Sequence, residues 1–230
     1  MEFAVEYSEE KDINVYLNAL YNKDWTDYGT NYHEISKKYY PIEFLENIKN
    51  SNTIEDARQV VSQYFKSTRN QYYLQSSEFV AKWFTKFLNE EQKLITGKLE
   101  KVFQQTFPFE KITVYLNSFY TNPYNYDEKW YMVGRDYNFW GLLKTSTHEL
   151  NHFMFFYYHQ EDLIKRGYNK SQIDHLKESL AVLTSNNPEK ENEFKPNVLP
   201  IQKFVYENKD NSVDKIIELE IQNKLLENIT

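Results

Sequence analysis

Residues 146–159, STHELNHFMFFYYH, contain the side chains whose types and spacing are best suited to chemistry. His148 and His152 are four positions apart, and Glu149 directly follows the first histidine. On an α-helix such histidines differ by about 40° in azimuth and lie one turn apart, so both imidazoles can reach one ion. Glu149 lies at the edge of the same face, where it can accept a proton from a metal-activated water. We therefore predict a hydrolytic metal site with one Zn²⁺ per chain and Glu149 as general base.

Two histidines do not complete a catalytic zinc site, which has three protein ligands and an open position for water. If the helix continues, His159 lies about 10 Å along its axis from His152, too far to share an ion. Glu178 is our preferred third ligand, because the gap after His152 allows one helix to end and a second, predicted over 172–185, to return across it. Alternative ligands are the other nearby carboxylates: Glu161, Asp162 and Asp174.

The composition favours a folded protein that does not use thiol chemistry. The chain has 230 residues, of which 40% are hydrophobic, enough to form a substantial core. It has no cysteine, which excludes disulfides, thiolate metal sites and cysteine nucleophiles. The formal net charge is −7 and no basic block is present, which argues against nucleic acid as a partner.

The sequence shows no sign of membrane insertion or of a secretory signal. No segment approaches the roughly 20 apolar residues needed to cross a bilayer. The first residues, MEFAVEYSEE, lack the basic start and apolar run of a signal peptide. We expect a soluble, cytoplasmic protein without a membrane partner, with unconventional export left open and the oligomeric state unpredicted.

The first half of the chain is predicted to be mostly helical. Residues 3–8 alternate like a strand, and helical spacing then prevails to about residue 106. Ser76 predicts the start of one of these helices. The apolar positions expected to face the core on that helix are Phe79, Val80, Trp83, Phe84 and Phe87.

The second half combines strands and helices. Residues 111–119 and 129–136 are rich in β-branched and aromatic side chains and are predicted strands, separated by a turn at 121–128. An apolar helix over 139–158 carries the histidines, and a short helix ends at Gly167. Ser171 and Asp174 form a predicted capping box for the helix carrying Glu178. A final helix is expected over 212–226.

The predicted fold class is α+β and predominantly helical. We predict a helical N-terminal part, 1–107, packed on a catalytic part, 108–230, or alternatively one continuous domain over 1–230.

HELNH at 148–152 and the KESLAVL context of Glu178 resemble the gluzincin metallopeptidases of the thermolysin-like clan, including an uncharacterised bacterial subgroup with the same pairing. The resemblance covers about residues 111–185. It implies a zincin-like core, in which a small twisted sheet lies over the HExxH helix and a downstream helix supplies a glutamate. It also implies His148, His152 and Glu178 as zinc ligands, and an extended peptide or protein substrate bound along an edge strand, predicted at 129–136.

The chain departs from this family at one position. Many gluzincins carry an aspartate four residues after the ligand glutamate, where this chain has Val182. Another group must then orient a zinc-bound imidazole, and Asn151, Ser179 or a backbone carbonyl are the candidates.

The predicted function is that of a zinc-dependent metallopeptidase. A further donor should stabilise the developing oxyanion, and His175, Tyr206 and Arg135 are candidates. One alternative is a catalytically inactive zincin-fold binding or interaction protein. Others are a metal-free helical interaction protein and a hydrolase of non-peptide amides.

Overall fold

The computed structural model describes residues 1–22, 31–184, 199–223 and 225–226. It is an α+β structure, predominantly helical, as predicted. The helices of the first half are α1 (Glu9–Leu20), α2 (Tyr32–Ser36), α3 (Ile42–Lys49), α4 (Ile54–Thr68) and α5 (Gln71–Phe103). Those of the second half are α6 (Phe139–Phe155), α7 (Glu161–Lys165), α8 (Lys170–Leu180), α9 (Leu199–Glu207) and α10 (Val213–Gln222).

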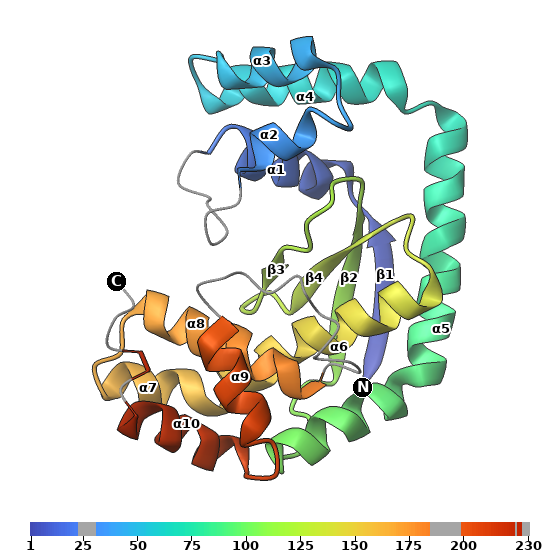
Figure 1. The fold of residues 1–230 in the computed structure, drawn as a ribbon. Helices are drawn as coiled ribbons and strands as arrows, with labels where there is room; N and C mark the ends of the chain where they lie inside the picture. Colours follow the sequence, from blue (N-terminus) through green and yellow to red (C-terminus); the bar gives the residue numbers. More distant parts are fainter. Residues whose placement is uncertain (23–30, 185–198, 224, 227–230) are drawn as a thin grey trace.

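A sheet of four strands lies between the helices (Figure 1). The strands are β1 (Glu2–Tyr7), β2 (Lys111–Asn117), β3 (Tyr124–Asn125) and β4 (Trp130–Gly134), in the spatial order β1-β2-β4-β3. The first three in that order are parallel, and β3 is antiparallel to β4. We predicted an edge strand at 129–136, and this prediction is wrong. The two-residue β3 pairs with the outer side of β4, so β4 lies inside the sheet.

The sheet separates two hydrophobic clusters because side chains alternate between its faces. Ile112, Val114 and Leu116 of β2 belong to the larger cluster with α5, α6, α8 and α10. Tyr115 and Met132 face the smaller cluster, formed mainly by α1, α3 and α4. Each large apolar side chain buried in this way stabilises the fold by roughly 1.5–3 kcal/mol.

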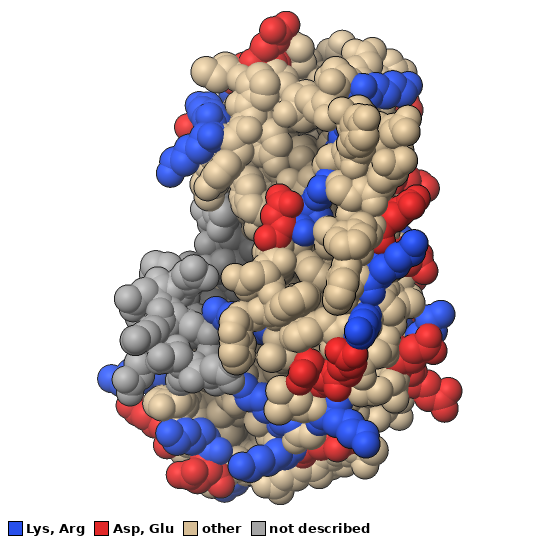
Figure 2. Space-filling model, turned by 90° about the vertical axis from the view of Figure 1, so that its right-hand side faces the viewer, with Lys and Arg blue, Asp and Glu red and all other residues tan. Residues whose placement is uncertain are grey.

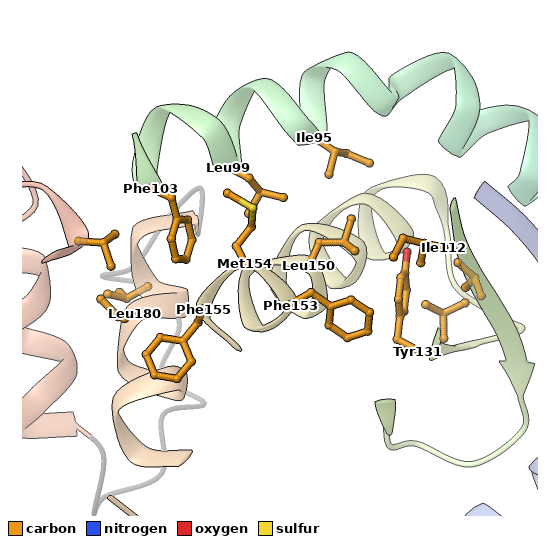
Figure 3. Packing of buried hydrophobic residues seen from close by; sticks show 14 of the residues in the cluster. Ile95, Leu99, Phe103, Ile112, Tyr131, Leu150, Phe153, Met154, Phe155 and Leu180 are labelled. Carbon is orange, nitrogen blue, oxygen red and sulfur yellow. The ribbon is translucent and has the colours of Figure 1, made fainter. Parts of the chain in front are cut away.

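Helix α6 is held against α5 by the larger cluster. Figure 3 shows Leu99 and Phe103 of α5 near Leu150 and Met154 of α6, and all four are buried. Phe153, on the same helix, points toward Tyr131 of β4, and both side chains are buried. This packing fixes the axis of the helix that carries the histidines.

The two predicted parts share both a sheet and a core. Strand β1, from the first part, pairs in register with β2, so that Phe3 lies opposite Ile112. Helix α5 runs along one side of the molecule from the α1–α4 layer to α6 (Figure 1). The boundary predicted at residue 107 therefore divides elements that pack together.

The outer edge of β1 is covered by α5. The Phe3 amide donates to Asn89 Oδ1 at 2.9 Å, and Asn89 Nδ2 donates to the Phe3 carbonyl at 2.8 Å. The Val5 amide donates to Thr85 Oγ1 at 3.0 Å. Side chains of a helix thus take the hydrogen-bonding positions that a neighbouring strand would occupy.

A buried ion pair ties the α1–α4 layer to the sheet. Asp12 of α1 is fully buried, and its Oδ2 lies 3.0 Å from Arg69 NH1, at the α4–α5 corner. Ser118, just after β2, donates to Asp12 from its amide and from its hydroxyl, both at 3.0 Å. Three separate segments therefore meet at one carboxylate.

The predicted start of α5 at Ser76 is wrong. The helix begins at Gln71, where the Asn70 side chain accepts hydrogen bonds from the amides of Tyr72 and Tyr73. The predicted apolar face is also partly wrong, because Phe79 and Trp83 are exposed. The buried positions follow a shifted stripe: Ser77, Ala81, Phe84, Leu88, Ile95, Leu99 and Phe103.

The predicted capping box of α8 is wrong as well. Asn169 and Gln172 form it instead, with the Asn169 side chain accepting from the Gln172 amide at 2.9 Å and the reciprocal bond at 3.0 Å. Gly167, with φ of 89°, ends the preceding helix as predicted. The end of the helix predicted over 172–185 is a 3₁₀ segment, Ala181–Thr184, and residue 185 is outside the described residues.

Charged side chains of both signs alternate over the face shown in Figure 2, without a large basic patch on it. Across the described residues, no helix is both long and apolar enough to cross a lipid bilayer.

Candidate metal centre

Helix α6 begins at a tight connection from β4. Asn138 caps the helix, its side chain accepting from the Gly141 amide at 2.8 Å. A Cβ at Gly134, the last residue of β4, would lie 2.7 Å from the Tyr137 ring. Glycine at 134 therefore lets Tyr137 fold back over the end of the strand, which sets the direction in which α6 leaves the sheet.

The two histidines lie one above the other on α6, as their spacing predicts. Their ring centroids are 4.5 Å apart. The His152 side chain is only 1% exposed, whereas that of His148 is 41% exposed. One imidazole is thus fixed in the core and the other borders solvent, so an ion held between them would be accessible from solvent.

Glu178 reaches both histidines from α8. Its Oε1 lies 3.4 Å from His152 Nε2, and its Oε2 lies 3.7 Å from His148 Nε2. One ligand atom from each of the three residues lies within 4.8 Å of the others. Ligands about 2.0–2.2 Å from a tetrahedral zinc ion are roughly 3.3 Å apart, so these separations fit one ion after small side-chain movements.

The packing of α8 explains why Glu178 is delivered there. Ile173, Leu176 and Leu180 are buried on one face, and Lys177 and Ser179 are buried as well, so the helix is enclosed on more than one side. Glu178 projects between these faces toward α6.

The alternative carboxylates lie in other pairs. Glu161 lies 2.8 Å from Lys165, and Asp162 lies 3.4 Å from Arg166. Asp174 Oδ1 is 3.8 Å from Lys177 Nζ. Within the described part of the chain, His148, His152 and Glu178 form the one group of three or more side chains with metal-binding geometry.

His159 is outside this group, in agreement with the axial distance expected from the sequence. It lies in a π-helical turn, Phe156–Gln160, and its Nδ1 is 3.5 Å from Asp214 Oδ1.

The environment of His152 favours its neutral, metal-binding form. Burial lowers the pKa of His152 well below its usual value, and the positive charges of Lys177 and His148 lower it further. An imidazole must be unprotonated at the coordinating nitrogen to bind a metal, so His152 is poised as a ligand at neutral pH.

Glu149 is also buried, at 5% exposure, directly beside His148. Burial raises the pKa of Tyr124 to about 12, and the charge of Glu149 is among the further causes that raise it. Glu149 has the same effect on the buried Tyr131 of β4. Its carboxylate therefore lies close to Tyr124 and Tyr131 of the sheet.

Lys177 and Tyr124 join the site, although the sequence analysis did not select them. Lys177 is 4% exposed, and its Nζ lies 2.6 Å from Tyr124 Oη and 3.1 Å from Glu178 Oε1. Burial alone would lower the pKa of Lys177, but Glu178, Tyr124 and Asp174 together raise it, so the ammonium stays charged. A lysine beside a glutamate on a helix normally faces solvent, and nothing in the sequence distinguishes this one.

The predicted oxyanion donors make other contacts. Arg135 donates to Ser76 and Ser77 of α5, and its guanidinium lies over the Tyr73 ring. His175 Nδ1 is 2.8 Å from the Ser171 carbonyl of its own helix. Tyr206 packs against the larger hydrophobic cluster.

The residues predicted to orient an imidazole also bond elsewhere. Asn151 Nδ2 donates to the Leu180 carbonyl at 3.5 Å and to Thr184 Oγ1 at 3.4 Å, which ties α6 to the end of α8. Ser179 Oγ donates to the Leu176 carbonyl. His152 Nδ1 is buried and has no hydrogen-bond partner among the described residues.

We compared the chain with protein-family models, curated proteins and solved structures, and none of the three comparisons gave a match.

Proposed function

We propose that this protein is a zinc-dependent metallopeptidase of the gluzincin type. One observation carries the proposal: two imidazoles from α6 and a carboxylate from α8 converge within 4.8 Å, with a buried glutamate next to the first imidazole. The donor set of two nitrogens and one oxygen is the one that catalytic zinc sites use in many peptidases.

The residues of the chain have distinct roles in this proposal. His148, His152 and Glu178 hold the ion and leave a position open. Bound zinc supplies a Lewis acid that lowers the pKa of water toward neutrality and polarises the scissile carbonyl. Glu149 accepts a proton from the attacking water and returns it to the nitrogen of the leaving amine.

A zincin-like core is part of the same proposal. The sheet lies against α6 and α8 crosses near the histidines, which supports it. Val182, at the position where many gluzincins have an aspartate, is 3% exposed and packs in the core. The outer nitrogen of the buried imidazole therefore needs a partner other than the one those relatives use.

The test combines metal analysis with substitution of the general base. Purified protein should bind one zinc ion per chain and cleave members of an unstructured peptide library, and a chelator should abolish cleavage. Glu149→Gln should retain zinc and lose roughly 10²–10⁴-fold in rate, because the variant cannot accept the proton. Glu161→Gln, an equivalent change at an exposed position, is the matched control.

Two results would contradict the proposal. Full activity of Glu149→Gln would remove the assigned base. Stoichiometric zinc without cleavage of any library peptide would instead favour the inactive zincin-fold binding protein.

A further inference from the structure

Tyr124 and Lys177 are joined by a short hydrogen bond whose direction is fixed by chemistry. An ammonium group has donors but no acceptor, so Tyr124 Oη must accept from Lys177 Nζ across the 2.6 Å between them. The hydroxyl hydrogen of Tyr124 is then free to donate elsewhere. Among the residues that the structure describes, no acceptor takes it.

This hydroxyl belongs to the metal centre. The Tyr124 ring centroid is 5.7 Å from that of His152. A continuous chain of polar contacts leads from Tyr124 Oη to Lys177 Nζ at 2.6 Å, to Glu178 Oε1 at 3.1 Å and on to His152 Nε2 at 3.4 Å. Tyr124 comes from β3, while the ligands come from α6 and α8, so the hydroxyl approaches the site from the sheet.

The ring of Tyr124 is held firmly. Phe153 and Phe156 lie with their centroids 6.1 and 6.0 Å from it, and Lys177 Nζ lies 4.9 Å from its centroid. A donor held by packing in this way costs little reorganisation when charge develops beside it.

We propose that Tyr124 donates its hydroxyl hydrogen to the oxyanion formed during peptide hydrolysis, and that Lys177 is the positioning residue that holds this hydroxyl. The inference rests on the function proposed above and adds the donor that it lacks. As the water oxygen bonds to the carbonyl carbon, Glu149 takes one water proton and the C=O π pair moves onto the carbonyl oxygen. Tyr124 donates to that oxygen. The pair then reforms C=O as the C–N bond breaks, and the amine nitrogen takes the proton from Glu149.

A purely structural role is the competing explanation for Lys177. Its ammonium also lies 3.8 Å from Asp174 Oδ1 and offsets the charge of Glu178. A residue with that role alone would affect folding or zinc affinity, but not the discrimination between substrate and transition state. The test therefore needs separate measurements of these quantities.

Tyr124→Phe is the central variant, because it removes only the hydroxyl. Tyr126→Phe is the matched control: its ring also lies near Phe153 and Phe156, at 5.8 and 5.3 Å, and no hydrogen bond of its hydroxyl is found among the described residues. Lys177→Met removes the ammonium and keeps an unbranched side chain. Zinc stoichiometry and thermal unfolding are measured first for every variant.

Tyr124→Phe should bind zinc normally, keep KM within a few-fold and lose roughly 10²–10³ in kcat, the usual effect of removing one oxyanion donor. A phosphinic peptide built on the best library sequence mimics the tetrahedral oxyanion. Its affinity for the zinc-loaded protein, measured by calorimetry, should weaken by a similar factor. Lys177→Met should also lower kcat, and adding it to Tyr124→Phe should cause little further loss, because it acts through that hydroxyl.

The possible failures are distinguishable. Unchanged kcat in Tyr124→Phe, an equal loss in Tyr126→Phe, or a loss of kcat with undiminished phosphinic-peptide affinity would each overturn the role of Tyr124. A zinc-loaded unaltered protein that cleaves no peptide would overturn the hydrolase function and this role together.

Discussion

Replacing Asp12 by alanine should strongly destabilise the protein, although Asp12 is not part of the candidate site. The carboxylate is fully buried and lies 3.0 Å from Arg69 NH1, whose side chain is 5% exposed. Asp12→Ala removes the counter-charge and leaves a buried guanidinium that cannot lose its proton. It also removes the acceptor for two hydrogen bonds from Ser118.

The expected loss is about 3–5 kcal/mol, the usual cost of leaving one member of a buried ion pair uncompensated. Domains are stable by only about 5–15 kcal/mol, so the effect is large. Burial raises the pKa of Asp12 in spite of Arg69, and buried ion pairs often do not fully offset the cost of desolvation. The double variant Asp12→Leu/Arg69→Met should therefore lose less than Asp12→Ala alone.

Unfolding of metal-free protein in guanidinium chloride, followed by circular dichroism, gives the free energy of unfolding for each variant. Asp136→Ala is the control, because the Asp136 side chain is 94% exposed, and it should leave the unfolding free energy nearly unchanged. A loss below 1 kcal/mol in Asp12→Ala, or a double variant worse than the single one, would refute this account of the pair.

Two further predictions concern pH and metal. Burial raises the pKa of the fully buried Glu220 well above its usual value, so the folded state holds a proton that the unfolded state releases above about pH 4.3. This contribution to the free energy of unfolding of metal-free protein falls as pH rises above about 4.3, whereas the lowered pKa values of His152 and His159 add stability as pH rises toward neutrality. Glu220→Gln should therefore make the slope of the unfolding free energy against pH, between pH 5 and 8, more positive than in the unaltered protein, and equal slopes in the two proteins would contradict this. Zinc at 100 times its Kd should add about 2.7 kcal/mol to the stability. His152→Ala should abolish that gain in thermal unfolding, and an undiminished gain would exclude His152 as a ligand.

Local periodicity predicted much of the candidate site. The four-residue spacing of His148 and His152 alone sets their common face, and the structure brings Glu178 to them. The choice of Glu178 over other carboxylates depended on a helix returning across α6, which the loop length allowed but did not require.

The cap of α8, the buried face of α5 and the short strand β3 could not be predicted from local periodicity. Asn169 and Ser171 are both good capping residues, and the helix begins after Asn169. The buried stripe of α5 passes through Ala81, whereas the larger Phe79 is exposed. Strand β3 has two residues, too few for any alternation to mark it.

The position of Tyr124 could not be predicted for the same reason. It lies in a segment rich in turn-forming residues, and its pairing with Tyr131 of β4 places it beside the candidate metal centre. Lys177 is buried where its ammonium meets the Tyr124 hydroxyl.

The cover that α5 provides for β1 has a consequence for the behaviour of the protein in concentrated solution. Strands with free amides and carbonyls at the margin of a sheet can recruit strands from other molecules and begin fibrous aggregates. With the polar groups of Phe3 and the Val5 amide already bonded to Asn89 and Thr85, this margin gives an incoming chain few partners. Two polar side chains on one helix thus limit intermolecular association at the first strand.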